Sequence, residues 1–143
     1  MNQTELDAII EKHKLWLDGK KDGKRANFTG KSLNGLNIAG ANLEWANFKS
    51  ADLTGANLSG ANLALANFKG SNLSGANFTG ANIAGANFRE ANTTGADFTG
   101  EKVDLTLSIK WKELLFRDNR VRTLPWQGNR ARFGRRAKTG RKR

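Results

Sequence analysis

A five-residue repeat sets the strongest limit on how this chain can fold. The stretch ANFTGANIAGANFRE, residues 76–90, contains three units that each begin with Ala-Asn and place a large apolar residue third. Side chains alternate in a strand and recur every 3.6 residues in a helix, so a period of five gives neither element one buried face. If the backbone turns a corner in every unit, each third residue can point toward a common axis. The repeat therefore predicts a solenoid.

The repeat runs without a gap over residues 26–100, as 15 units that fill 75 of the 143 residues. The third positions hold six Phe, six Leu, two Ile and Thr93, and the position before them is Asn or Asp in 14 units. Ala opens 12 units and Gly closes 11. We expect Asn side chains to form ladders between stacked coils and Gly to supply the corner conformations.

A second period indicates the cross-section of the solenoid. Four phenylalanines recur every 20 residues, which is four units: Phe28, Phe48, Phe68 and Phe88. A three-sided coil would instead align residues 15 apart, a poorer match that pairs Phe28 with Leu43, Leu58 and Leu73. The sequence thus predicts a four-sided solenoid of about four coils, with like residues about 4.8 Å apart along the axis.

The run A-[ND]-[LF]-x-[GSx] resembles the pentapeptide-repeat family, whose bacterial and bacteriophage members often begin with a helix and a Gly-Lys linker. The resemblance implies an all-β solenoid, a right-handed quadrilateral β-helix. It also implies interaction with protein or nucleic acid and no catalytic motif. Thr93 at a centre and Lys31 at an inward position depart from the pattern and suggest a looser fit near both ends of the array.

The residues before the array, 1–25, read as a capping helix and a linker. We expect the helix to run from about Glu5 to Leu17, with Thr4 as its N-cap and Gly19 as its stop. Six residues share one face, which should cover the first coil: Leu6, Ile9, Ile10, His13, Trp16 and Leu17.

Residues 101–127 are expected to cap the other end. Apolar residues alternate with polar ones from Val103 to Trp111, which is typical of a half-buried strand. The next stretch fits a hairpin that turns at Asp118-Asn119, or a short helix over 111–116 followed by a strand. Residues 128–143 are too polar and too basic to bury a core and should be disordered when free.

Charge is distributed unevenly along the chain. Residues 1–25 carry six basic and five acidic residues, residues 26–100 four of each, and residues 101–143 fourteen basic and four acidic. This asymmetry predicts a nucleic acid or another acidic macromolecule as partner of the last segment. The expected phosphate-binding residues are Arg130, Arg132, Arg135, Arg136, Lys138, Arg141, Lys142 and Arg143, while Trp126 and Phe133 could stack on bases. A purely solubilising tail is the alternative.

Two columns at 20-residue spacing are further candidates for binding. Lys49, Lys69 and Arg89 would form a basic stripe, either a nucleic-acid contact or an ordinary solvated face. Trp45 and Leu65 replace the usual Gly on successive coils, and Leu105 would extend their column. We expect either a partner-contact patch, which could support a homodimer, or a surface covered by the helix or the C-terminal segment.

The residue inventory speaks against an enzyme. The chain has one His, no Cys and no Tyr, and the four acids of the array, Glu44, Asp52, Glu90 and Asp97, lie on scattered units. We therefore expect no catalytic site, cofactor or metal. The absence of Cys and of a long apolar run favours a cytoplasmic protein without a membrane partner.

The sequence favours a non-enzymatic binding module, a rigid β-helix that presents a basic tail. The runner-up is a protein-directed inhibitor, of the topoisomerase or defence-system type. The quinolone-resistance branch of the family is thought to imitate DNA with an acidic rod. A neutral array and a basic tail are a poor match for that mechanism.

Overall fold

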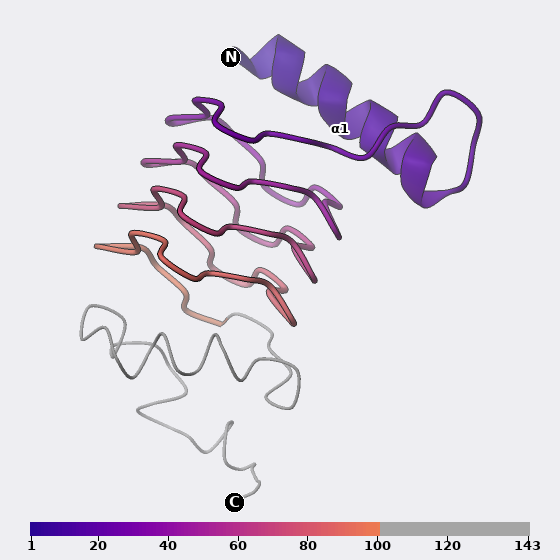
Figure 1. The fold of residues 1–143 in the computed structure, drawn as a ribbon. Helices are drawn as coiled ribbons and strands as arrows, with labels where there is room; N and C mark the ends of the chain where they lie inside the picture. Colours follow the sequence, from indigo (N-terminus) through magenta and orange to yellow (C-terminus); the bar gives the residue numbers. More distant parts are fainter. Residues whose placement is uncertain (101–143) are drawn as a thin grey trace, which may run out of the picture.

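The computed structural model describes residues 1–100, which form one helix, α1, and a stack of coils (Figure 1). Helix α1 spans Gln3–Leu17. The prediction of Thr4 as N-cap is wrong: the Asn2 side chain accepts a hydrogen bond from the Glu5 amide, and the Glu5 carboxylate accepts one from the Asn2 amide. This capping box starts the helix earlier than the sequence pattern suggested, because it satisfies two free amides at once. The expected stop at Gly19 is confirmed, since its φ is +68°.

Each coil contains four units, as the 20-residue period predicted. Parallel bridges join residues 20 apart, from Asn27–Asn47 at one end of the stack to Asn77–Asp97 at the other. The Phe28 amide donates to the Asn47 carbonyl at 2.7 Å, and the Asn47 amide donates to the Ala26 carbonyl at 3.1 Å. Within residues 1–100 the bridges stay isolated and no longer strand forms, because every unit turns after three extended residues. The fold is a four-sided β-helix with very short rungs.

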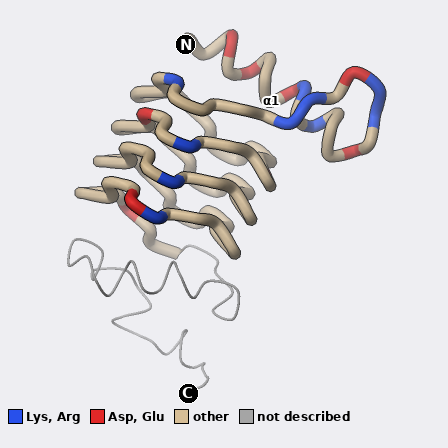
Figure 2. The backbone as a smooth tube through the Cα atoms, in the orientation of Figure 1, with Lys and Arg blue, Asp and Glu red and all other residues tan. Residues whose placement is uncertain are grey.

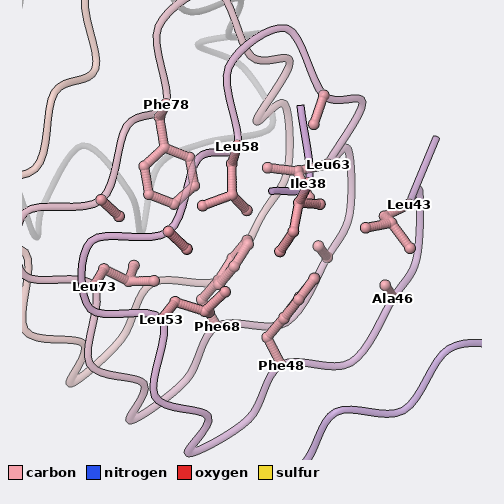
Figure 3. Packing of buried hydrophobic residues seen from close by; sticks show 14 of the residues in the cluster. Ile38, Leu43, Ala46, Phe48, Leu53, Leu58, Leu63, Phe68, Leu73 and Phe78 are labelled. Atoms are coloured by element: carbon pink, nitrogen blue, oxygen red, sulfur yellow. The ribbon is translucent and has the colours of Figure 1, made fainter. Parts of the chain in front are cut away.

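The predicted phenylalanine column fills the interior (Figure 3). Its ring centroids lie 4.8 Å apart for Phe28–Phe48, 4.7 Å for Phe48–Phe68 and 5.0 Å for Phe68–Phe88. Phe78 meets Phe68 edge to face from the opposite side of the coil, at 5.8 Å. The Ala, Leu and Ile residues that point inward are buried around these rings. The core is therefore continuous along the axis.

The two units that depart from the pattern behave differently. The Thr93 side chain is buried at a centre, and its Oγ1 has no hydrogen-bond partner. Lys31 was assigned to an inward position, but it is exposed. Its backbone stays in register, because its N–H donates to the Phe28 carbonyl and its carbonyl accepts from the Asp52 amide, each at 2.9 Å, so only the side chain leaves the interior.

Most asparagines cap turns and do not form ladders. The Asn47 Oδ1 accepts from the Lys49 amide two residues on, at 2.9 Å, and equivalent residues repeat this contact around the stack. Side-chain ladders between coils are found in one column of the described residues, Asn42–Asn62–Asn82, at 3.2 and 3.3 Å. The short Asn side chain is thus needed mainly to close each corner.

Left-handed backbone explains the Gly at the end of most units. Four units of the array place another residue there, with φ of +71° at Trp45, +57° at Ser50, +61° at Leu65 and +62° at Glu90. For residues with a Cβ this conformation costs about 1–2 kcal/mol. These four corners are locally strained.

Glu90→Gly should relieve that strain and raise the free energy of unfolding by up to about 1 kcal/mol, because the exposed Glu90 side chain contributes little packing. Ala39→Gly is the control, since Ala39 is exposed but lies outside the positive-φ residues. It should lower stability by about 0.5–1 kcal/mol. Urea titration measures both, and changes of the same sign would contradict the assignment of strain.

Helix α1 lies across the first coil (Figure 1) and supplies hydrogen-bond partners for backbone groups at its open edge. The Gln3 amide group pairs with the Asn37 backbone, donating to its carbonyl at 2.8 Å and accepting from its N–H at 2.9 Å. Leu6 and His13 are fully buried, whereas Trp16 on the same predicted face is 37% exposed. The described residues hold no helix with the length and apolarity that a bilayer span requires.

Candidate interaction surfaces

The predicted basic stripe is an exposed column on one corner of the solenoid. Lys49, Lys69 and Arg89 are each the fourth residue of a unit, and their amides donate to Asn47, Asn67 and Asn87 at 2.9, 2.9 and 3.0 Å. Within residues 1–100, none of the three forms an ion pair. Figure 2 shows the basic segments recurring at this corner of successive coils. The corner therefore presents one available cation on each of three successive coils.

The predicted apolar column is also exposed within the described residues. Trp45 is 46% and Leu65 38% exposed, so α1 does not cover them. A Cβ added to Gly85 would lie 2.7 Å from Leu65 Cδ2, which shows that the Leu65 side chain extends over the next coil. Gly85 gives it the room to do so.

Sequence reasoning missed that these two columns border the same side of the solenoid. Only Ala46, Asn47 and Phe48 separate Trp45 from Lys49, and the same spacing recurs one coil later between Leu65 and Lys69. The alanines and phenylalanines point inward, so an asparagine lies between the columns on each coil. The signal was present in the sequence, as two 20-residue series offset by four residues.

A hollow lined by several basic side chains lies beside the first coil, and it was not predicted from the sequence. It is lined by Ala8, Ile9, Lys12, Lys24, Arg25 and Asn27. The Arg25 Nε donates to the Trp45 carbonyl at 2.7 Å, so its guanidinium lies next to the apolar column. Arg25 precedes Trp45 by 20 residues, and this spacing could have found it.

His13 is a structural residue of the helix-to-coil contact. Its Nδ1 accepts from the Ala26 amide at 2.9 Å, so its Nε2 carries the proton and donates to the Glu44 carbonyl at 2.9 Å. Burial lowers the pKa of His13 below 6.5, and the nearby charge of Arg25 acts in the same direction, while the Glu44 carbonyl opposes them. The ring is therefore neutral when folded and has no nitrogen left for a ligand.

The acidic residues do not assemble a reactive site. The Thr54 hydroxyl and amide lower the pKa of Asp52, and Thr99 does the same for Asp97. Both carboxylates thus stay ionised as replacements for the turn-closing Asn. No group of His, Asp and Glu within residues 1–100 could hold a metal ion. The predicted tail cations, Trp126, Phe133 and Leu105 lie outside the described residues.

Comparison with known proteins places this repeat in a family. The model of pentapeptide repeats matches residues 26–63 and 61–100, which together exceed half of the chain. No curated protein matches the chain significantly.

Solved structures of pentapeptide repeat proteins are similar to this chain. A pentapeptide repeat protein from Nostoc Pcc 7120 is 26% identical, with a TM-score of 0.54 over 66% of this chain and 93% of that one. HetL, a pentapeptide repeat protein involved in heterocyst differentiation regulation from the same cyanobacterium, is 31% identical, with a TM-score of 0.41 over 57% of this chain and 52% of HetL. The unbroken repeat, the four-unit coil and the match to the family model agree. The chain belongs to the pentapeptide repeat family.

Proposed function

We propose that this protein is a non-catalytic interaction module that binds nucleic acid through its basic C-terminal residues. The observation that carries the proposal is the charge distribution: residues 101–143 hold fourteen basic and four acidic residues, against ten and nine in residues 1–100. Such a local excess binds polyphosphate chains by releasing their counterions.

Nucleic acid is the polyanion that best fits the composition of this segment. Six of the eight cations between residues 128 and 143 are Arg, which binds phosphate in a bidentate manner. Trp126 and Phe133 add flat surfaces on which bases can stack. Gly and small residues separate the cations, so they can follow a backbone but are not held against base edges. We expect binding with little sequence preference.

In this proposal the β-helix is a rigid scaffold that carries the basic C-terminal segment. Its interior is closed by stacked rings, and Asp52 and Asp97 of the array and His13 of α1 are engaged in structural hydrogen bonds. The array has equal numbers of acidic and basic residues, which argues against imitation of DNA by an acidic surface. Binding by the attached basic segment is the simpler reading.

The experiment compares two full-length variants with the same loss of charge. Arg130, Arg132, Arg135 and Arg136 are changed to Gln in one, and Lys14, Lys20, Lys21 and Lys31 in the other. Fluorescence anisotropy with random-sequence duplex DNA should show at least a tenfold loss of affinity for the first variant and less than a threefold loss for the second. Equal losses would mean that net charge alone matters, and would overturn the assignment to the C-terminal segment.

A further inference from the structure

One side of the solenoid combines an apolar edge, a row of amides and a cationic edge. We define the amide face by Asn47, Asn67 and Asn87 at its centre, with Trp45 and Leu65 on one edge and Lys49, Lys69 and Arg89 on the other. The stacked Phe48, Phe68 and Phe88 rings behind it repeat at 4.7 and 5.0 Å, so the surface residues repeat at this spacing too. The face is therefore a regular ladder with two chemically different edges.

The packing of residues 1–100 does not account for the apolar edge. Trp45 and Leu65 occupy left-handed corners, where most units of the array have Gly, and their side chains remain 46% and 38% exposed. Ser50 and Glu90 share this backbone conformation, but their side chains are polar and need no partner. Strained backbone and exposed large apolar side chains are both typical of surfaces that contact another molecule.

We propose that the amide face binds an amphipathic acidic helix of a partner protein, with the helix axis along the solenoid. One helical turn rises about 5.4 Å, so successive turns stay within roughly 1 Å of successive coils over the three coils of the face. Four residues of extended chain separate the edges by at most about 13 Å, which matches a helix about 10–12 Å across. Apolar residues of the helix would contact Trp45 and Leu65, and acidic ones Lys49, Lys69 and Arg89.

The charges around the face favour a helix over a nucleic acid. Glu44 lies beside Trp45 at the apolar edge and Glu90 beside Arg89 at the cationic edge, so a phosphate chain would meet a carboxylate at each edge. A helix can instead carry acids on one flank only and leave the other flank neutral or basic. At the amino-terminal end of the face, Lys12, Lys24 and Arg25 line a hollow, and a helix C-terminus with its partial negative charge would be stabilised there.

The probe is a labelled, Ala-rich helical peptide of about 20 residues, long enough to be helical in water. It carries one Leu stripe with Glu on one flank and Lys on the other. A control peptide has Gln in place of every Glu. Binding to the full-length protein is measured by fluorescence anisotropy, alongside Trp45→Gly/Leu65→Gly and Lys49→Gln/Lys69→Gln/Arg89→Gln. The first variant restores the usual corner residue, so it should fold at least as well as the parent.

We expect the Glu peptide to bind and the Gln peptide to bind at least fivefold more weakly. Trp45→Gly/Leu65→Gly should lose at least tenfold and the triple variant at least fivefold, while Lys14→Gln/Lys20→Gln/Lys31→Gln should bind like the parent. Absence of peptide binding, or equal binding to all variants, would overturn the proposal. So would a loss of DNA affinity in Trp45→Gly/Leu65→Gly, or a smaller species than the parent in sedimentation, which would assign the face to nucleic acid or to a second copy.

Discussion

Phe68→Ala should lower the free energy of unfolding by about 3–5 kcal/mol, because it removes a fully buried ring from the middle of the core. Phe68 stacks on Phe48 at 4.7 Å and on Phe88 at 5.0 Å, and it meets Phe78 edge to face at 5.8 Å. Coils above and below are fixed by backbone hydrogen bonds and cannot collapse into the cavity. Urea unfolding monitored by circular dichroism measures the loss.

Phe28→Ala is the matched comparison within the same column. Phe28 is equally buried, but among the rings of residues 1–100 it stacks on Phe48 alone, and its other side faces the helix end of the solenoid. In a stacked repeat, a terminal coil can open without unfolding its neighbours. We therefore expect a smaller loss in global stability than at Phe68. Small and equal effects at both positions would contradict the stacked column.

Acidification should weaken the protein through His13. Folding holds the imidazole neutral between the Ala26 amide and the Glu44 carbonyl, so its folded pKa lies below 6.5, whereas the unfolded chain takes up a proton near 6.5. The unfolded state thus binds more protons in this range. The stability contributed by His13 is complete above about pH 6.5 and decreases as the pH falls below it, by at most about 1.4 kcal/mol per pH unit.

His13→Gln tests this assignment, because an amide does not titrate. Its stability should be lower than that of the parent at neutral pH but should change less between about pH 7 and pH 5. Asp52 and Asp97 do not contribute to the change in stability over this pH range. Their pKa values lie below 3.8 in the folded protein, so their contribution is lost only in more acidic solution. A parent protein with unchanged stability across this range would refute the role of His13.

The sequence predicted the coil well for two reasons. Every unit follows the same five-residue pattern, and like residues recur at a spacing of 20, which indicates how the coils stack. Phe28 and Phe48 are far apart along the chain, yet their 20-residue spacing gave the contact that the structure shows at 4.8 Å. The αL corners at Trp45 and Leu65 could also be read, as replacements of Gly. The repeat could not predict which hydrogen-bond partner a side chain takes when several are within reach.

Two details illustrate this limit. Asn2 and Thr4 are both good N-caps, and the choice depends on Glu5 folding back three residues. Asn side chains can bridge coils or close their own turns. In most units the Asn Oδ1 accepts from the backbone amide two residues later, which closes the turn. The pairing of Gln3 with Asn37 depends on tertiary structure, and no periodicity in the sequence encodes it.

The salt dependence of DNA binding tests the proposed function most directly. If all eight cations of residues 128–143 contact duplex DNA, log K should fall against log salt concentration with a slope of about −7, or about −3.6 if half of them do. A chain that ends at Gln127 should lose most of this slope and keep the circular dichroism and unfolding transition of the β-helix. Equal affinity and slope in the two proteins would contradict the account.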